Sequence, residues 1–532
     1  MDREFNLLDE PWIRVMLPDF TQKELSLTDV LLKAHEIRDL AGELPAQDTA
    51  VLRLLLAVLH TVFSRSDENG DAYEIEEPDE ALRRWGALWN EGSFPEIPVR
   101  RYLEEQRGRF WLFDPERPFF QVPGIAGTDY TAAKLNGALS ESGNKTRLFP
   151  PCAGEGKAAL SYAEAARWLL FVNGYDDTSA KPKQKGLPSP GAGWLGKIGA
   201  VCAVGENLFE TLMLNLVLLR DRYSCWEEGG PAWERETPKA GERTEIPLPD
   251  NQPELLTLQS RRLLLKREGG AVTGYTLLGG DFFQRENAFT EQMTVWRTVT
   301  DKNKQITGFQ PKRHDKSRQM WRDFAAFAAQ GEGKKRPGVV EWAAVLKEGG
   351  LLPDDRLLRL RITGVQYGDK DFFITDEFSD SLEFNAGLLT EAGDVWQELA
   401  LIEIELCGNV AWIVGNLADD LEKASGGGGS AADRATEQFY YRLDVPFREW
   451  LRTLDPGQGT PARDERRKAW RSKVKTIAAA LGKEYMAQAG EAAFAGRMLT
   501  EDGKERRYSA PEAFNFFIYR LNKIINGRDA EQ

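Results

Sequence analysis

The stretch TEAGDVWQELALIEIELCGNVAWIVGNLADDLEKA, residues 390–424, decides the fold of the C-terminal part of the chain. Its apolar residues recur at helical spacing throughout, which predicts one long helix. Further helical stretches follow at residues 432–454, 463–487 and 510–526. Long amphipathic helices joined by polar loops are typical of a helical bundle. The sequence therefore predicts a C-terminal four-helix bundle, with SGGGGS at residues 425–430 as a flexible break after its first helix.

The N-terminal part mixes short strand and helix signals. Residues 4–30 predict two short strands around a turn. Residues 48–63 predict a helix, because their apolar side chains recur at helical spacing, and Asp48 or Thr49 is its predicted N-cap.

The middle of the chain adds two further elements to this mixture. Residues 107–123 predict strands on both sides of a proline-bearing turn, and residues 208–223 predict a buried helix. The predicted fold class is therefore α+β. We expect a large mixed α/β domain at residues 1–385 and the four-helix bundle at residues 386–532.

The composition excludes several classes of protein. The chain has 532 residues, 42% of them apolar, so it can bury more than one core and is not disordered overall. A formal net charge of −14 excludes a uniformly basic nucleic-acid binder, although it leaves local basic patches open. The four cysteines lie far apart and form neither a zinc-binding spacing nor a disulfide framework. We therefore expect no metal and no cofactor.

The N-terminal residues MDREFNLLDEPW lack the basic and apolar regions of a signal peptide. No run of about 18 uncharged apolar residues occurs, so we expect no membrane span. Together with the cysteine usage, these features favour a cytoplasmic protein.

The stretch GAGWLGK, residues 191–197, matches G-x-G-x-x-G and most of a P-loop. A P-loop needs Ser or Thr after its lysine to bind magnesium, whereas Ile198 stands there. Both motifs also follow a strand and open a helix. Here prolines precede the motif, and residues 197–205 have the pattern of a strand. We expect close packing at these glycines, next to a flexible basic loop, KPKQKG, at residues 181–186.

No local pattern specifies a catalytic site. The three histidines are His35, His60 and His314; we expect His60 in a core and His314 in solvent. No nucleophile elbow or zinc-protease motif is present. Two alternatives stay open: a standalone hydrolase with an unrecognised carboxylate site, and an assembly scaffold that makes only protein contacts.

Basic side chains recur every four residues in RDERRKAWRSKVKTIAAAL, residues 463–481. At this spacing they form one slanting stripe on a helix. The stripe is either a solvated face or a track for phosphates. Its members are Arg463, Arg467, Arg471 and Lys475. The residues expected to face the bundle core are Trp470, Val474, Ile477 and Leu481.

Basic loops at residues 301–318 and 331–338 allow the same two interpretations. The stretch VQYGDKDFF, residues 365–373, predicts a hairpin with its tip at residues 368–370. Without further evidence, one interpretation of this tip is a surface turn with no role in binding.

Several segments together resemble the large subunit of the type I-E CRISPR surveillance complex, the CasA subunit of Cascade. Their order and spacing, followed by the bundle, carry the resemblance over nearly the whole chain. The segments are FNLLDEPWIRV at 5–15, ERPFFQVPG at 116–124, GAGWLGKIG at 191–199 before a helix with LMLN, and ATEQFYYRLDVPF at 435–447.

The resemblance implies a DNA-reading subunit without catalysis. Such a subunit recognises the protospacer-adjacent motif (PAM) in double-stranded DNA, helps to open the duplex for guide RNA pairing, and recruits a helicase-nuclease. Its implied partners are the other Cascade subunits, the 5′ handle region of the guide RNA, the target duplex and the helicase-nuclease. Guide pairing reads the target, so the protein reads only a short motif and backbone shape.

The resemblance also implies three DNA-motif loops: a loop with an anchoring aromatic residue, a glycine loop against the minor groove, and a wedge hairpin. Their matching residues here are Phe149; Lys183, Lys185 and Gly186; and Gly368, Asp369 and Lys370. This chain departs from the family pattern in three places. Pro151 stands where relatives can have Asn, the hairpin tip lacks the wedge Gln (Gln366 is nearest), and Arg285 is the nearest match to a lysine finger.

Overall fold

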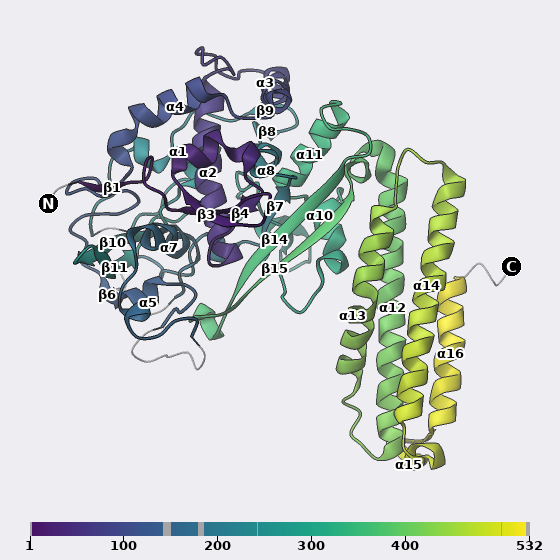
Figure 1. The fold of residues 1–532 in the computed structure, drawn as a ribbon. Coiled ribbons are helices and arrows are strands. Elements are labelled where there is room, and N and C mark those ends of the chain that lie inside the picture. The colour runs from purple at the N-terminus through teal and green to yellow at the C-terminus, as the bar shows by residue number, and fades with distance from the viewer. Residues whose placement is uncertain (1–2, 142–149, 179–185, 242, 502, 528–532) are drawn as a thin grey trace. The chain divides into compact units, whose positions relative to one another are not determined.

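The computed structural model (Figure 1) describes residues 3–141, 150–178, 186–241, 243–501 and 503–527. Its internal contacts divide the chain into two compact units. The first comprises residues 1–318, 329–352 and 358–381, and the second comprises residues 319–328, 353–357 and 382–532. The domain boundary expected at residues 385 and 386 stays a prediction.

Small sheets and helices make up the first unit. Its three-stranded sheets have the orders β3 (Gln22–Leu25), β2 (Ile13–Met16), β4 (Asp39–Leu40); β10 (Arg261–Glu268), β11 (Ala271–Gly279), β6 (Thr128–Thr131); and β15 (Ile374–Asn385), β14 (Leu357–Tyr367), β7 (Ala200–Val204). Its two-stranded sheets pair β1 (Glu4–Asn6) with β5 (Trp111–Phe113), β8 (Leu219–Asp221) with β9 (Ser224–Cys225), and β12 (Trp296–Thr300) with β13 (Ile306–Pro311). The ends of β14 and β15 run into the second unit.

The central helix of the first unit is α2 (Pro45–Arg65), which is buried on almost all sides. Among the described residues it alone is long and apolar enough to cross a membrane, and 94% of that window is buried inside the protein. The other helices of this unit are α1 (Leu27–Leu32), α3 (Pro78–Glu91), α4 (Glu96–Glu105), α5 (Ala132–Leu135), α6 (Glu155–Ala158), α7 (Tyr162–Tyr175), α8 (Leu208–Asn215), α9 (Gln252–Leu256) and α11 (Gly338–Glu348).

The predicted N-cap of α2 is wrong. The helix begins at Pro45 with Leu44 as its N-cap, because proline has no N–H to leave unpaired in the first turn. Asp48 therefore lies inside the first turn, where its carboxylate accepts a hydrogen bond from the backbone N–H of Gly42 at 2.8 Å.

Other segments of the first unit also differ from expectation. Residues 27–30 begin α1, which the side chain of Ser26 caps, instead of continuing a strand. Of the two strands predicted within residues 107–123, only β5 forms.

The predicted helix at 208–223 ends at Asn215, and β8 follows it. The side chain of Asn215 pairs with the backbone of Ala203 on β7. A short apolar run has the same pattern in a helix and in a buried strand.

The predicted four-helix bundle is confirmed in the second unit. Its helices are α12 (Asp394–Ser425), α13 (Ala432–Arg452), α14 (Thr460–Gln488) and α16 (Ala510–Asn526). The same unit contains α10 (Phe324–Ala328), α15 (Glu491–Ala495) and the pair β16 (Arg497–Glu501) and β17 (Lys504–Tyr508).

Aromatic rings fill the core of the bundle. Trp470 on α14 stacks on Trp450 of α13 with ring centroids 5.2 Å apart, and Phe447 lies 5.2 Å from Trp470. Trp470, Val474 and Leu481 are buried as predicted, whereas Ile477 is half-buried. Gly426, the first glycine of SGGGGS, ends α12 in the left-handed conformation (φ +100°) that glycine adopts at little cost.

A buried carboxylate joins two helices of the bundle. Glu403 on α12 is fully buried, and it pairs with Arg471 (Nε–Oε1 2.9 Å) and with Arg467 (Nε–Oε1 3.5 Å) on α14. Burial raises the pKa of Glu403, and the two arginines oppose that shift.

We predict that Arg471→Ala destabilises the bundle by about 1–3 kcal/mol, because it leaves a buried carboxylate short of a donor. Calorimetric unfolding of the full chain measures this effect. Adding Glu403→Gln to Arg471→Ala should recover part of the loss, since the uncompensated charge is gone. A double variant no more stable than the single one contradicts this account of Glu403.

Candidate nucleic-acid interface

The hairpin of β14 and β15 ends in a strained turn. Neighbouring strands joined by so short a link run antiparallel, and the backbone N–H of Gly368 donates to the carbonyl of Phe373 across the turn. Lys370, Asp371 and Phe373 all have positive φ, between 55° and 65°. Residues other than glycine seldom adopt this conformation, and such strain concentrates at functional sites. The hairpin predicted at residues 365–373 is confirmed.

The tip of this hairpin is fastened to Thr178, the last described residue before the glycine loop. Thr178 donates its backbone N–H to the carbonyl of Asp371 (3.0 Å) and its hydroxyl to the carbonyl of Lys370 (2.8 Å). The structure thus brings the base of the predicted glycine loop against the predicted wedge hairpin.

Arg313 makes a second connection. Its guanidinium donates two hydrogen bonds to the carboxylate of Asp371, at 2.6 and 2.9 Å, and its Nε donates to the carbonyl of Gly196 at 2.6 Å. A guanidinium suits this position because its donors form a rigid planar fork. The hairpin tip is therefore held to both ends of the segment from Thr178 to Gly196.

The glycines of GAGWLGK are required for packing. A Cβ at Gly193 would overlap the carbonyl of Gly174 at the end of α7. A Cβ at Gly196 would overlap the hydroxyl of Tyr367, which ends β14 and donates to the carbonyl of Tyr175 at 2.6 Å. Strand β7 follows the motif, as expected, so close packing replaces a nucleotide site here. Gly186 is exposed with φ +88°, and a Cβ there would meet nothing.

Cations surround the segment from Gly186 to Lys197. Arg243 donates to the carbonyl of Pro188 at 2.5 Å, and Arg261 donates to the carbonyl of Gly191 at 2.7 Å. Burial first, and then the charges of nearby arginines with Arg261 foremost, lower the pKa of Lys197 to about 8. Arg261 forms an ion pair with Asp176, whereas Lys197 has no hydrogen bond or ion pair to a carboxylate within the described ranges. Lys197 therefore leaves a positive charge in this segment, which favours an anion.

Residues near the predicted loop with the anchoring aromatic, NKTRLFPP at 144–151, are also paired. Lys157 contacts both carboxylate oxygens of Glu141, at 3.0 and 2.9 Å. Lys134 on α5 forms a buried ion pair with Asp177 at 2.7 Å, next to Thr178. Phe149, Lys183 and Lys185 themselves lie outside the described residues.

The basic stripe on α14 divides into two pairs. Arg467 and Arg471 contact Glu403 inside the bundle. Lys475 is exposed and Arg463 is half-buried, and neither has a carboxylate partner among the residues that the structure describes. A role of the stripe in DNA binding stays a prediction.

Comparison with known proteins decides the family. Residues 6–481 match the family model described as CRISPR-associated protein Cse1. The chain belongs to the Cse1 family. The CRISPR-associated protein CasA/Cse1 of Thermus thermophilus is 31% identical over 431 residues, which cover 79% of this chain and 78% of that protein.

Two solved Cse1 structures agree with this assignment. Cse1 of Thermobifida fusca is 32% identical with a TM-score of 0.83, covering 98% of each chain. Cse1 of Acidimicrobium ferrooxidans is 26% identical with a TM-score of 0.78, covering 98% of this chain and 99% of that one. The resemblance to the large Cascade subunit inferred from the sequence is confirmed, as is the α+β fold with its helical C-terminal region.

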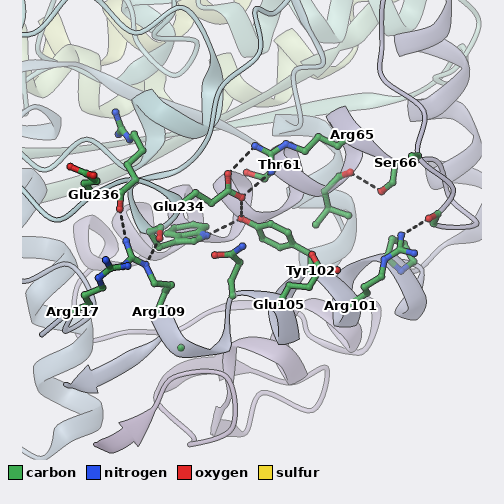
Figure 2. Close-up of a pocket in the computed structure, with 18 of the residues that line it drawn as sticks. Thr61, Arg65, Ser66, Arg101, Tyr102, Glu105, Arg109, Arg117, Glu234 and Glu236 are labelled. Carbon is green, nitrogen blue, oxygen red and sulfur yellow. Dashed lines mark hydrogen bonds and ion pairs between the residues drawn. The ribbon is translucent and has the colours of Figure 1, made fainter. Parts of the chain in front are cut away.

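In this Cse1 chain a cavity of about 1040 Å³ is lined by arginines and glutamates of the first unit (Figure 2). Its central carboxylate, Glu234, accepts two hydrogen bonds from Arg65 at 2.9 Å and one from the hydroxyl of Tyr102 at 2.7 Å. Burial raises the pKa of Tyr102, and Glu234 adds to the shift. Trp233 completes the chain of donors to Tyr102. This closed network holds α2, α4 and the segment around Trp233 together.

The structure tests the expectations for two of the histidines. His60 is buried in α2, as expected, and burial lowers its pKa to about 3. The expectation that His314 is solvated is wrong, because it is half-buried and its Nε2 lies 3.0 Å from the carbonyl of Ala200.

Sequence reasoning missed the anchors Thr178 and Arg313. Arg313 lies in the basic loop at 301–318, so the sequence showed a basic side chain there. Its partners Asp371 and Gly196 lie 58 and 117 residues away, and no local pattern links them.

We predict that Gly196→Ala lowers stability by about 1–3 kcal/mol, because the added methyl displaces Tyr367 from under the hairpin. Gly191→Ala is the matched control, since a Cβ there meets only Lys197 at 3.4 Å. Thermal unfolding of both variants measures the difference. Equal melting temperatures contradict the packing role of Gly196.

Proposed function

We propose that this Cse1 chain is the PAM-sensing subunit of a type I-E Cascade complex. In this proposal it recognises the PAM in double-stranded DNA, helps to open the duplex for guide RNA pairing, and recruits the helicase-nuclease, with no catalysis of its own. Its partners are the other Cascade subunits, the 5′ handle region of the guide RNA and the target duplex. The complex acts in the cytoplasm. Residues 1–385 form the motif-sensing domain, and residues 386–532 form the bundle.

One observation carries the proposal: the strained hairpin tip and the base of the glycine loop are bonded to each other. Thr178 contacts Lys370 and Asp371, and Arg313 joins Asp371 to Gly196. A reader of the minor groove needs backbone close to the base edges and a rigid element that enters the stack. Two loops held as one rigid surface meet both needs.

The charge of Lys197 beside these loops supports phosphate contacts. Lys197 itself has no carboxylate partner among the described residues, and the charges of Arg243 and Arg285 act on it. On the bundle, Arg463 and Lys475 are the stripe members that keep free donors for the DNA backbone. Such local patches let an acidic protein hold DNA inside a complex.

Exposed aromatic side chains on the bundle favour protein contacts as a second role. Trp412 on α12 is largely exposed, and Arg520 of α16 lies 5.0 Å from its ring and 4.0 Å from that of Phe516. Clusters of Trp, Phe and Arg are typical of protein interfaces. The scaffold alternative thus becomes part of the proposed function.

We predict that Lys183→Ala with Lys185→Ala weakens binding of PAM-bearing duplex by the reconstituted complex about tenfold or more. Loss of two phosphate contacts should also reduce the slope of log K against log salt by about 2. A shift assay across salt concentrations measures both. Lys23→Ala, an exposed lysine on β3, is the control. Unchanged affinity and slope in the double variant contradict the glycine-loop assignment.

Lys197 predicts a pH dependence. Its pKa of about 8 keeps it charged at pH 7 and neutral at pH 9, and a bound phosphate raises that pKa. DNA affinity should therefore be intact below pH 8 and fall by about tenfold as the pH rises to 9, the value of one charge-assisted contact. Lys197→Arg stays charged and should remove this fall, whereas Lys197→Met should bind weakly at both pH values. The same pH profile in all three proteins contradicts a role for Lys197.

A further inference from the structure

A second cavity of about 550 Å³ lies in the first unit, apart from the hairpin tip and the glycine loop. The β8–β9 hairpin, the segment before β12, the basic loop at 331–338 and α11 form its walls. The ion pair between Arg222 of the hairpin and Glu341 of α11 ties two of these walls together. The cavity shares no lining residue with the segment 178–197 or the turn 368–373.

One wall of the cavity is aromatic. Phe289 is 36% exposed, and its ring packs edge-on against Trp296 with centroids 5.2 Å apart. Tyr223, at the tip of the β8–β9 hairpin, is 84% exposed, and Trp342 of α11 completes the wall. Exposed aromatic faces of this kind are platforms on which a nucleobase stacks.

Two donors in this wall lack acceptors. The indole N–H groups of Trp296 and Trp342 are buried, and neither has a hydrogen-bond partner within the described ranges. Buried N–H groups are nearly always paired in proteins. Both tryptophans line the cavity, so their N–H groups are donors that suit an oxygen of a bound ligand.

Cations lie beside the aromatic wall of the cavity. Lys335 is half-buried, and its Nζ lies 4.2 Å from the centroid of Phe289. Lys334 and Arg220 are exposed, and among the described residues no carboxylate pairs with them. The cation of Lys335 lies over the aromatic wall itself, so charge and a flat apolar surface meet at one place.

The carboxylates of the cavity are occupied by other groups. Glu341 pairs with Arg222 and Arg336, and Glu291 accepts two hydrogen bonds from Arg53 outside the cavity. Asp221 accepts the backbone N–H of Tyr223 within its own hairpin and keeps its negative charge, which acts on Lys335 together with that of Glu341. The lining nevertheless holds five cationic side chains against three carboxylates, so its balance is positive in a chain whose net charge is −14.

We propose that this cavity binds a nucleotide, with the base against Phe289 and Tyr223 and the phosphate at Lys334, Lys335 and Arg220. A volume of about 550 Å³ accommodates one nucleoside phosphate. The nucleotide comes either from the free pool or from one position of a single strand. The inference does not rest on PAM sensing, because it concerns the isolated chain and other residues.

Titration calorimetry of the full-length chain at about 50 mM salt tests the proposal with four probes: inorganic phosphate, AMP, UMP and a ten-residue deoxythymidine strand. We expect one site per chain and binding of a nucleotide probe at least tenfold tighter than that of phosphate. If AMP or UMP binds with an affinity equal to that of the strand, the ligand is a free nucleotide. Binding of the strand alone identifies a single-stranded partner.

Variants assign the site. Phe289→Ala and Tyr223→Ala should each weaken binding about tenfold through lost stacking, and Lys335→Met should weaken it and lower the salt slope by about 1. Tyr223 is 84% exposed, and Lys335→Met keeps the length of the half-buried side chain, so these variants fold even where Phe289→Ala does not. Phe20→Ala is the matched control, since Phe20 is exposed with Arg38 over its ring at 4.5 Å.

Two results overturn the proposal. One is the absence of binding by every nucleotide probe at millimolar concentration. The other is an equal affinity in Tyr223→Ala, Lys335→Met and Phe20→Ala, which would place any bound nucleotide elsewhere on the chain.

Discussion

The arrangement of the wedge hairpin and the glycine segment depends on the hydrogen bonds of Arg313. Its guanidinium joins the hairpin tip, through Asp371, to the glycine segment, through the carbonyl of Gly196. Gly196 has no side chain, so the hydroxyl of Tyr367 can lie against the segment, and the guanidinium of Arg313 lies 4.8 Å from the centroid of the Tyr367 ring. Removing either partner of Arg313 breaks this connection and leaves the tip with its two bonds to Thr178. The strained turn at Lys370, Asp371 and Phe373 persists because its surroundings hold it.

Electrostatics in this protein work by local pairing. In the bundle, Glu403 forms ion pairs with Arg467 and Arg471. In the cavity of Figure 2, Glu234 forms an ion pair with Arg65 and accepts a hydrogen bond from Tyr102. These arginines neutralise the carboxylates and connect the elements that carry them. Cations without a carboxylate partner indicate where an anionic ligand binds, because no nearby negative charge cancels their attraction for it. Among the described residues, such cations include Lys197 beside the glycine segment, and Lys334 and Arg220 at the second cavity.

The long elements of the fold follow from the sequence, and the short ones do not. Residues 390–424 and the three later helices carry a helical period over many turns, and the structure forms them nearly as expected. The start of α2 was missed because Pro45 needs no N-cap side chain. The apolar run after Asn215 has no period that separates helix from strand, so tertiary contacts with β7 decide it.

The candidate site shows the same limit. The hairpin and the packing role of GAGWLGK were visible in the pattern of residues, since turn residues and glycines act locally. Thr178 and Arg313 were not, because their bonds cross 192 and 117 residues of chain. The stripe on α14 has the spacing of a phosphate track, yet the partner of Arg471 lies on another helix. Periodicity places a side chain on a face but does not say what that face meets.

The central claim is that the hairpin tip touches the PAM. A photo-crosslinking residue at position 370, in the reconstituted complex bound to a PAM-bearing duplex, tests it most directly. The account predicts a crosslink to the PAM nucleotides and its loss when the PAM is mutated. A crosslink confined to other DNA positions, or one that does not depend on the PAM, contradicts it.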